Sequence, residues 1–364
     1  MQNWEKGELG KFVTLKRGFD LPQQKRDSGE VPIFSSSGIT GMHSKTMVKA
    51  PGVITGRYGT IGQVFFSSKD FWPLNTTLFV EDFHGNDEKF VYYFLKTLNW
   101  ENFASASAVP GINRNTVHKE LVCFPDIKSQ KKIAGILSLL DDKIETNQNI
   151  NDNLEQQLHQ LFIQTFNGCD TNITLGKVVK TTSGGTPARK HREYYSNGTI
   201  NWVKSKELTG QYLFDTEESL TSLGVAMSSA KILPAHSVLI AMYGATVGEH
   251  GITTKEMACN QAICALLENK DYPYTYLFQI AKENQQNLVN LAIGSAQQNI
   301  SQILLKQLPV HSDVATIHQY HCLALPLHKE IELLQSENRL LNTTRDALLP
   351  ELMTGELDLS SLDF

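Results

Sequence analysis

The sequence lacks the features that mark secreted, membrane-spanning or zinc-binding proteins. Its 364 residues include five cysteines, an odd number, and no two of them form a CxxC pair. Scattered, unpaired cysteines indicate reduced thiols and no zinc site. No stretch approaches the roughly 18 consecutive apolar residues of a membrane-spanning helix, and the first five residues lack the charged and apolar regions of a signal peptide. We therefore expect a cytoplasmic protein without a membrane partner.

Motifs for catalysis and metal binding are missing as well. The sequence has no GxxxxGK[ST] loop for a nucleotide, and no FxGxG or [DNS]PP[FYW] motif of an amino-methyltransferase. The D-x-K spacing of nuclease metal sites occurs at Asp126 and Asp141, but the first lies at an expected helix start and the second on a polar helix face. His318, His321 and His328 have no further ligand at a matching spacing. We predict no catalytic residue, metal or cofactor in this chain.

An excess of positive charge, the usual mark of a protein that binds DNA alone, is also missing. The chain carries 33 basic and 38 acidic residues, a formal net charge of −5. Residues 126–168 (4 basic, 6 acidic) and 310–364 (3 basic, 9 acidic) hold the acidic excess. Residues 1–125 (14 and 12) and 169–309 (12 and 11) are slightly positive. Either DNA is not the ligand, or a partner supplies part of the charge that binds phosphates.

What the sequence does contain is a long internal repeat. The segment at 9–13 returns at 175–179, and Gly18 falls in register with Gly184. The segment at 57–62 returns at 242–248 with one residue inserted, after which equal spacing aligns Asn75 with Asn260. The period, roughly 165 to 185 residues, is far longer than the ~20–50 residues of solenoid repeats. The repeat predicts a duplicated globular domain, and two similar domains suit a long, repetitive ligand such as DNA.

Each unit of the repeat ends in a long amphipathic helix, predicted over about 129–166 and 312–353. Apolar residues at alternating steps of four and three form a heptad seam in both, which predicts a left-handed coiled coil. Asn147, Asn151 and Asn338 lie in these seams, where a buried Asn fixes register and partner. Each helix packs either on its own domain or, as two matched seams favour, on the other helix. We expect Gly168 to end the first helix and Pro326 to kink or restart the second.

The globular units have the pattern of mixed α/β domains. Short β-rich runs punctuated by glycine, serine and proline predict strands at 52–55, 63–66, 200–203 and 237–240. Apolar residues spaced along one face predict a helix over about 87–98.

The chemistry left in these units is that of binding. Residues 56–59 and 243–246 are glycine-flanked turns with a polar aromatic side chain, which either approach phosphates and base edges or serve only a tight turn. The basic patches at 188–192 and 204–206 either bind phosphates or are solvated surface. The polar runs at 35–38 and 296–299 carry groups able to pair with base edges.

These motifs resemble the specificity (S) subunit of type I restriction–modification systems over essentially the full chain. The similar segments of the first unit are 18–22, 31–41, 56–62 and 107–114, and those of the second are 183–187, 202–204 and 294–300. The helices add 130–134, 140–145 and 345–357, which are highly specific in combination. One departure is Asn201, where the family commonly has proline before the Trp, and it affects a local turn at most.

The resemblance implies an α+β fold in which two similar α/β target recognition domains are separated by two long antiparallel coiled-coil helices. The expected boundaries are 1–125 and 169–309 for the domains, 126–168 for the central helix, and 310–364 for the C-terminal helix and acidic tail. It implies a non-catalytic, DNA-binding subunit of a bacterial or archaeal phage-defence complex that reads a bipartite double-stranded DNA target. Two methyltransferase subunits, which use S-adenosylmethionine to methylate adenine, would dock on the helices. Restriction translocase–nuclease subunits, which use ATP and Mg, would join them.

Two sets of candidate residues follow. The candidate DNA contacts are Ser36, Ser37, Arg57, Tyr58, Asn113, Arg114, Arg189, Lys190, Lys204, Lys206, Tyr243, Gln297 and Gln298. The candidate residues of the spacer helices and their partner contacts are Leu140, Ile144, Asn147, Asn151, Leu154, Ile331, Asn338, Leu341 and Leu348. The alternative function is a non-enzymatic scaffold, in which two β-rich domains on a coiled coil bind protein instead of DNA.

Overall fold

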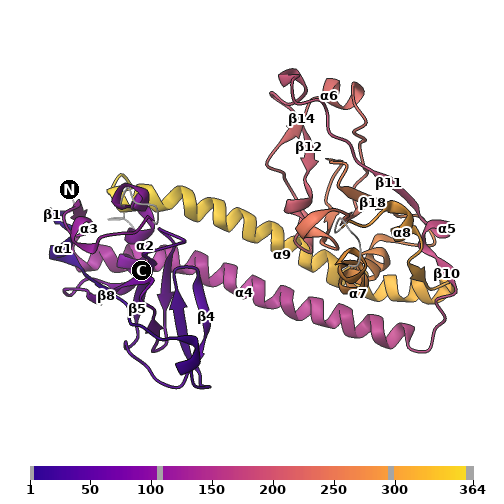
Figure 1. The fold of residues 1–364 in the computed structure, drawn as a ribbon. Helices are drawn as coiled ribbons and strands as arrows, with labels where there is room; N and C mark the ends of the chain where they lie inside the picture. Colours follow the sequence, from indigo (N-terminus) through magenta and orange to yellow (C-terminus); the bar gives the residue numbers. More distant parts are fainter. Residues whose placement is uncertain (1–3, 105–109, 294–298, 358–364) are drawn as a thin grey trace. The chain divides into compact units, whose positions relative to one another are not determined.

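The computed structural model describes residues 4–104, 110–293 and 299–357, which form two compact units (Figure 1). Unit 1 comprises Met1–Glu145 and Arg339–Phe364, and unit 2 comprises Thr146–Asn338. The long helices α4 (Ile127–Phe166) and α9 (Val314–Thr354) each give one segment to unit 1 and the other to unit 2. Mixed helix and strand domains with two long helices are the fold class expected from the sequence.

Unit 1 contains a four-stranded antiparallel sheet of order β2-β8-β5-β6 and a three-stranded sheet of order β4-β3-β7. Its strands are β1 (Glu5–Glu8), β2 (Thr14–Arg17), β3 (Val31–Ser35), β4 (Gly38–His43), β5 (Gly52–Gly56), β6 (Val64–Ser67), β7 (Trp72–Pro73), β8 (Thr77–Asp82) and β9 (Leu121–Phe124). Its shorter helices are α1 (Leu9–Phe12), η1 (Gln23–Lys25), α2 (Glu88–Thr97), η2 (Trp100–Phe103) and α3 (Arg114–Val117). The predicted strands at 52–55 and 63–66 and the helix at 87–98 are confirmed within one residue as β5, β6 and α2.

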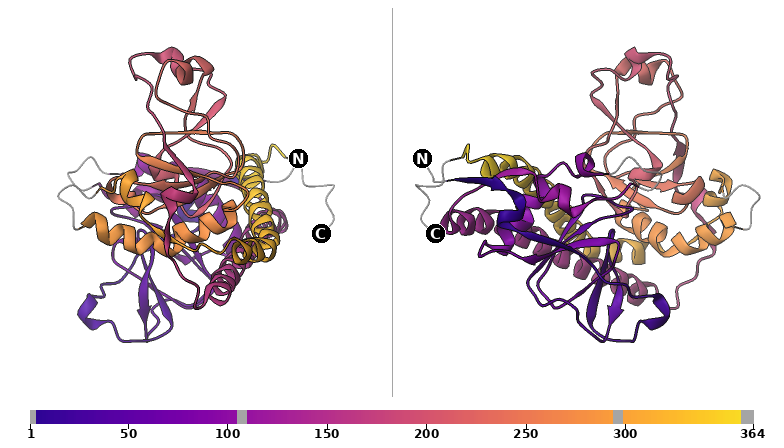
Figure 2. Two further views of the ribbon diagram at one scale, coloured as in Figure 1. Left: turned by 90° about the vertical axis from the view of Figure 1, so that its right-hand side faces the viewer. Right: turned by 60° about the vertical axis from the view of Figure 1, so that its left-hand side comes forward.

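Unit 2 contains a five-stranded sheet of order β11-β18-β15-β16-β13 and a three-stranded sheet of order β14-β12-β17. Its strands are β10 (Ile173–Thr174), β11 (Lys180–Ser183), β12 (Ile200–Val203), β13 (Gln211–Leu213), β14 (Ser219–Leu220), β15 (Val238–Ala241), β16 (His250–Thr253), β17 (Ala258–Cys259), β18 (Ile263–Leu267) and β19 (Pro309–Val310). Its shorter helices are α5 (Leu175–Val178), η3 (Arg192–Tyr194), η4 (Ser205–Glu207), α6 (Ser222–Ala226), η5 (Gly244–Thr246), α7 (Tyr274–Ile293) and α8 (Gln302–Lys306). The predicted strands at 200–203 and 237–240 are confirmed as β12 and β15. Within unit 2, β12, β14 and α6 lie far from the segments of α4 and α9 (Figure 2).

The internal repeat is visible in the hydrogen bonds at the entry of each unit. The Leu9 N–H donates to the carbonyl of Glu120 at 2.8 Å where α1 begins, and the Leu175 N–H donates to the carbonyl of Leu308 at 2.9 Å where α5 begins. Before each helix a strand pairs antiparallel with a later one, β1 with β9 and β10 with β19. The predicted duplication of a domain is confirmed.

Gly18 and Gly184 occupy equivalent places, as their predicted register requires. The Gly18 N–H donates to the carbonyl of Thr77 at 3.1 Å, and the Gly184 N–H donates to the carbonyl of Ile263 at 3.4 Å. A Cβ atom on either glycine would lie 2.2 Å or less from a backbone oxygen of the neighbouring strand region. Both positions therefore require glycine because another backbone passes too close for a side chain.

The alignment of Asn75 with Asn260 is wrong, because Gln261 is the counterpart of Asn75. The Gly18 N–H donates to the carbonyl of Thr77, and Asn75 lies two residues before Thr77. The Gly184 N–H donates to the carbonyl of Ile263, and Gln261 lies two residues before Ile263. The residue inserted in the glycine-flanked turn of unit 2 shifts every later position by one. Both side chains bind the residue that lies two positions after the glycine: Asn75 donates to Asp20, and Gln261 accepts from Thr186.

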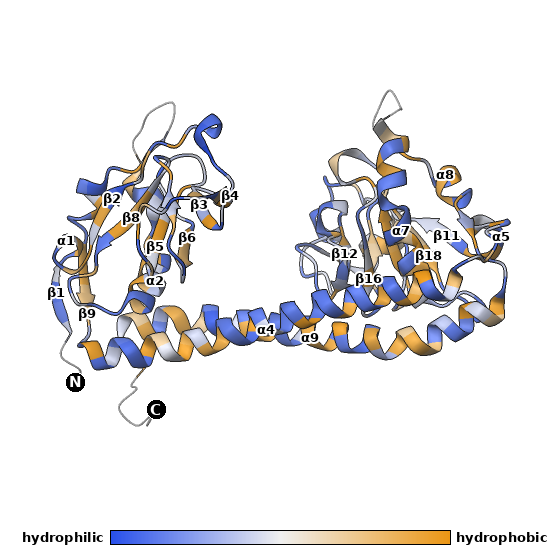
Figure 3. Cartoon of the chain, turned by 90° about the horizontal axis from the view of Figure 1, so that it is seen from below, coloured by the Kyte–Doolittle hydropathy of each residue, from blue (hydrophilic) through white to orange (hydrophobic). Residues whose placement is uncertain are grey.

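In each unit the segments of α4 and α9 pack on each other and on the domain. In unit 1, Leu137 of α4 and Leu352 of α9 share one core with the domain. In unit 2, the ring centroids of Phe162 and Tyr320 lie 5.5 Å apart, and both rings belong to the core of the domain. Hydrophobic residues accordingly recur along both helices and fill the central strands (Figure 3). Each helix therefore packs both on its own domain and on the other helix, so both packings considered from the sequence occur.

The predicted seam is confirmed by a contact between two asparagines. Asn147 is completely buried, and its amide donates to the side-chain oxygen of Asn338 at 2.8 Å. Phe162 follows Asn147 along α4, whereas Tyr320 precedes Asn338 along α9, so the two segments in unit 2 run antiparallel. The hydrogen bond joins two positions singled out from the heptad pattern alone.

Both long helices are followed by a glycine in the left-handed conformation. Gly168 and Gly355 each have φ of +74°, which only glycine adopts without strain. A Cβ atom on Gly355 would lie 2.9 Å from the Trp4 ring, so the end of α9 meets the start of the described chain within unit 1. The expected end at Gly168 is confirmed. Of the two outcomes expected at Pro326, a kink or a restart, the restart is wrong, because α9 continues through this exposed residue. Neighbouring Ala324 and the flanking leucines pack in the core.

Candidate nucleic-acid interface

In unit 1 the glycine-flanked turn holds Arg57 and Tyr58 in a fixed stack. The turn follows β5, and the Arg57 guanidinium carbon lies 4.5 Å from the centroid of the Tyr58 ring. Arg57 Nε donates to the carbonyl of Ile112 at 3.3 Å, and the Ile112 N–H donates to the carbonyl of Arg57 at 3.0 Å. A Cβ atom on Gly111 would lie 2.1 Å from Tyr58 Cε1. The ring can occupy this place only because residue 111 is glycine.

Ser36 and Ser37 lie in the turn between β3 and β4, beside this stack. The Ser37 N–H donates to Ser35 Oγ at 3.2 Å, which fixes the turn. A Cβ atom on Gly59 would lie 3.3 Å from Ser36 Oγ, and one on Gly56 would lie 3.1 Å from Ser36 Cβ. The serine turn therefore touches the turn that carries Arg57 and Tyr58.

Asn113 and Arg114 are exposed and follow directly on Ile112, which is hydrogen-bonded to the same turn. The Asn113 side chain accepts from the Asn115 N–H at 3.0 Å and so caps the start of α3. The predicted DNA contacts of unit 1 thus come from three segments of the chain that lie against one another. Their arginine, amide and hydroxyl groups are those that pair with phosphates and base edges.

In unit 2 the turn after β15 is built in the same way. The Ile300 N–H donates to the carbonyl of Met242 at 2.9 Å, and Tyr243 forms a β-bridge with Asn299. Tyr243 is 41% exposed, so part of its side chain is open to solvent. Met242, the counterpart of the arginine in unit 1, is buried and carries no charge. The tyrosine is therefore the feature that the two turns share.

Two of the predicted contacts in unit 2, Gln297 and Gln298, lie outside the described residues. Both precede Asn299, which is described and pairs with the turn.

The predicted cations of unit 2 lie around β12, in a different sheet from the strand that precedes Tyr243. Arg189 donates to both carboxylate oxygens of Glu218. Its guanidinium carbon lies 4.5 Å from the centroid of the Tyr195 ring and 5.1 Å from that of Trp202. Lys190, next to it, is exposed. The planar group of Arg189 is thus held by a carboxylate at its edge and by aromatic rings on its face.

Lys204 and Lys206 are also bound by carboxylates. Lys204 Nζ lies 2.8 Å from Glu217 Oε2 and 2.9 Å from Glu218 Oε1, and the lysine side chain is only 17% exposed. Lys206 Nζ lies 2.8 Å from Glu217 Oε2. Hydrogen bonds from Arg189 and Lys204 lower the pKa of Glu218 to about 2, so this carboxylate stays charged at neutral pH.

Sequence reasoning missed these acidic residues. Glu217 and Glu218 follow Lys204 by 13 and 14 positions, and no motif marks them. They reach the lysine because the chain between β12 and β14 folds back and pairs the two strands. A cross-strand pairing of opposite charges was the signal that could have revealed them, but its register depends on the length of the intervening loop.

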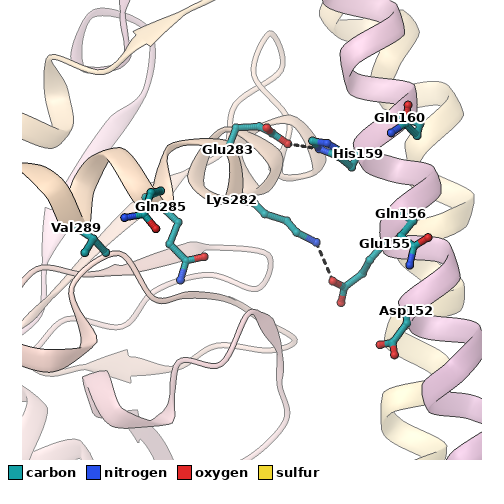
Figure 4. Close-up of a pocket in the computed structure, with 10 residues that line it drawn as sticks. Asp152, Glu155, Gln156, His159, Gln160, Lys282, Glu283, Gln285 and Val289 are labelled. Carbon is teal, nitrogen blue, oxygen red and sulfur yellow. Dashed lines mark hydrogen bonds and ion pairs between the residues drawn. The ribbon is translucent and has the colours of Figure 1, made fainter. Parts of the chain in front are cut away.

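A polar groove of about 770 Å³ runs between α4 and α7 in unit 2 (Figure 4). Lys282 of α7 lies 2.7 Å from Glu155 of α4, and His159 Nδ1 lies 2.7 Å from Glu283. These side chains face one another across the groove and tie α7 to α4. The groove therefore serves the attachment of the domain to the helix.

The candidate spacer residues lie in the seam between α4 and α9. Asn147, Asn151 and Ile331 are buried. The others are half-buried, namely Leu140, Ile144, Leu154, Asn338, Leu341 and Leu348. Such positions hold the helices together and leave little surface for another protein. The helices expose other apolar side chains that sequence reasoning passed over: Leu139 (62%) and Leu340 (67%) in unit 1, and Ile150 (40%) and Leu333 (62%) in unit 2.

The histidines and aspartates weighed as metal ligands have separate structural contacts. His318 Nε2 lies 2.7 Å from the carbonyl of Lys270, and His328 Nδ1 lies 2.9 Å from the hydroxyl of Tyr212. Asp126 caps α4, accepting from the Ser129 N–H at 2.9 Å. Within residues 4–104, 110–293 and 299–357, no group of three or more His, Cys, Asp or Glu side chains could hold a metal ion, and no helix is long and apolar enough to cross a membrane.

Comparison with known proteins agrees with this architecture. The type I restriction enzyme MjaIX specificity subunit of Methanocaldococcus jannaschii is 24% identical over 306 residues, covering 75% of this chain and 70% of that protein. The EcoR124I/EcoR124II specificity subunit of Escherichia coli is 22% identical over 215 residues, covering 56% of this chain and 53% of that protein. The crystal structure of a type I restriction–modification system S subunit from M. genitalium has the same fold, with a TM-score of 0.65 and 18% identity over 99% of this chain and 97% of that one.

The decisive match is to a family of domains. Residues 1–156 and 171–311 each match the type I restriction modification DNA specificity domain, so both copies of the internal repeat are accounted for. The resemblance inferred from the sequence motifs is confirmed, and the chain belongs to the family of type I restriction–modification specificity subunits.

Proposed function

We propose that this chain reads a bipartite double-stranded DNA target for a cytoplasmic type I restriction–modification complex, with each unit reading one half. The observation that carries the proposal is the duplicated turn. Tyr58 and Tyr243 each follow a residue, Arg57 or Met242, whose carbonyl accepts a hydrogen bond from the N–H of Ile112 or Ile300. A rigid turn that presents an aromatic ring beside polar side chains suits the edge of a base pair. Two copies suit two short blocks of sequence.

In this proposal the chain carries out no chemistry itself. Two methyltransferase subunits dock on exposed apolar side chains of α4 and α9, such as Leu340 in unit 1 and Leu333 in unit 2. They bind S-adenosylmethionine and methylate an adenine that is turned out of the duplex. Restriction translocase–nuclease subunits, which bind ATP and Mg, complete the assembly that cuts DNA.

The charge distribution supports a shared DNA interface. Affinity for duplex DNA depends strongly on cations that neutralise phosphates, yet the globular units are nearly neutral and the helices acidic. We expect the isolated chain to bind its target weakly, and its methyltransferase partner to restore specific binding. An electrophoretic shift with and without the partner measures this, and tight specific binding by the chain alone would contradict it.

Exchange of one domain tests the reading of two half-sites. Residues 1–125 are replaced by the first domain of another family member, and the methylated motif is read by methylation-sensitive sequencing of the host genome. Only one block of the motif should change, because the second domain is untouched. A change in both blocks would contradict independent reading. A chain that supports no sequence-specific methylation, but binds a protein partner, would favour the scaffold alternative.

A further inference from the structure

The backbone at Glu217 and Glu218 is fixed beside β12 by hydrogen bonds. The Glu207 side chain accepts from the Lys204 N–H at 2.7 Å and from the Glu217 N–H at 2.8 Å. The Trp202 N–H donates to the carbonyl of Glu218 at 3.1 Å. These bonds join the end of β12, which Lys204 follows, to the segment before β14, which carries the two acids. The paired strands β12 and β14 are labelled next to each other in Figure 1. The backbone that carries the two acids is therefore held next to the backbone that carries Lys204, although the Glu217 and Lys206 side chains themselves are more than half exposed.

The cluster combines groups for phosphate binding with groups that oppose it. Arg189, Lys204 and Lys206 contribute three positive charges, and Glu217 and Glu218 remove two of them. A phosphate that approaches Lys204 meets both carboxylates within 3 Å of the ammonium group. Binding requires either that a carboxylate is displaced or that the phosphate tolerates its repulsion. Both reduce the affinity that the same three cations would give if they were unpaired.

We propose that Glu217 and Glu218 are specificity-determining residues of unit 2, which withhold Arg189, Lys204 and Lys206 from the phosphates of non-target DNA. The inference rests on the proposed function, since it presumes that unit 2 meets a duplex. Discrimination against a wrong partner can be built from repulsion as well as from attraction. A random duplex offers this cluster only phosphates, which the carboxylates repel. A target also offers base edges to Tyr243 and its neighbours, and those contacts offset the repulsion.

The test compares charge-neutralised variants on random and target duplexes as a function of salt. Glu217→Gln and the double variant Glu217→Gln/Glu218→Gln are prepared as full chains in complex with the methyltransferase partner. Each additional phosphate that the protein neutralises should steepen the salt dependence by a slope of about 0.9, which is roughly 3.5-fold in affinity between 50 and 200 mM salt. The double variant frees two charges and should bind random duplex more tightly. Between 50 and 200 mM salt, its affinity for random duplex should fall by a factor about 12 times larger than the factor for wild type. Its preference for target over random duplex should fall.

Matched controls separate the cluster from net charge. Glu256→Gln and Glu256→Gln/Asp271→Asn remove the same charges from unit 2 at positions outside the cluster. They should leave the salt slope and the preference for target unchanged. Because Glu218 also holds Arg189, thermal unfolding of each variant is recorded, and Glu217→Gln, at a half-exposed position, tests the proposal without that risk.

Three results would overturn the inference. Equal effects of the cluster variants and the controls would show that net charge alone is felt. A second result is that the folded Glu217→Gln variant and the double variant bind random duplex as wild type does, while the wild-type complex selects its target. This result would reject the inference and leave the proposed function standing. A wild-type complex that selects no DNA sequence would reject both.

Discussion

In unit 2 the amide of Asn147 donates a 2.8 Å hydrogen bond to the side-chain oxygen of Asn338, across the seam between α4 and α9. Asn147 also donates to Glu337 at 2.7 Å. A buried amide whose acceptors lie on the other helix specifies one register, because a shift along the helix would separate it from them. The bond therefore selects the pairing of the helices as much as it stabilises it.

Asn147→Ala should lower the free energy of unfolding by about 1–3 kcal/mol, because it removes the donor shared by two buried or half-buried acceptors. The double variant Asn147→Leu/Asn338→Leu should recover most of the loss, since the amides are then removed together and apolar groups fill the seam. Urea unfolding of the full chain measures both. A double variant no more stable than the single one would show that the hydrogen bond is not the source of the effect.

Asn151 should behave in the opposite way. It lies one turn further along the same seam and is only 1% exposed, and its side-chain nitrogen and oxygen have no hydrogen-bond partner among the described residues. Burial of an amide without a partner costs about 1–3 kcal/mol. Asn151→Leu should raise the free energy of unfolding by a similar amount, measured by the same urea titration. A loss of stability would mean that a bound water satisfies the amide.

Gly111→Ala should weaken reading of the first half-site. The new Cβ atom would displace the Tyr58 ring, whose Cε1 atom lies 2.1 Å from that position. Loss of a base contact costs about 1–3 kcal/mol, or roughly 5- to 150-fold in affinity. Competition between duplexes altered in one block or the other measures the effect, with Tyr58→Phe as the control that keeps the ring. Equal losses for both blocks would point to a general defect.

Leu333→Arg should weaken binding of the methyltransferase subunit. Leu333 is 62% exposed on α9 in unit 2 and packs little in this chain, so a charge there should disturb a partner more than the fold. Ser336→Arg places the same charge on the same helix at another exposed position. Sedimentation of mixtures with the methyltransferase should show less complex for the leucine variant alone. Equal assembly of both variants would place the docking surface elsewhere.

His328 should make the stability of unit 2 depend on pH. Burial lowers the pKa of His328 to about 3, whereas an unfolded histidine has a pKa near 6.5. The folded state holds the neutral ring, so its contribution to stability is complete above pH 6.5 and is lost as the pH falls toward 3. The loss approaches about 1.4 kcal/mol per pH unit. Unfolding titrations at pH 7, 6 and 5 should show a shallower pH dependence for His328→Leu, and parallel curves would contradict the assignment.

The sequence predicts best those features whose pattern lies within one short stretch of the chain. The seam positions Asn147 and Asn338 were found from spacing alone, because a heptad repeat needs no knowledge of distant segments. Arg57, Asn113 and Ser36 were proposed separately from motifs, and only the structure shows that their segments touch.

The failures have equally specific causes. Gln261 was missed because one inserted residue changes the register of everything that follows it. Glu217 and Glu218 were missed because ion pairs across a loop leave no periodic trace in the sequence. Pro326 was expected to kink or restart the second helix, and the restart does not occur, because the residues around it pack in the core and offset the cost of the lost backbone hydrogen bond.

Unit 1 is assembled from two distant parts of the chain, and this sets an order of events during synthesis. Its first part ends at Glu145, while the segment that supplies Leu352 and Met353 to the same core begins at Arg339. Unit 2, in contrast, is one continuous stretch. At about 5–20 residues per second, the ~200 intervening residues take the ribosome roughly 10–40 s to make. The first residues to emerge must therefore wait for the last, and unit 2 can finish folding before unit 1 is closed.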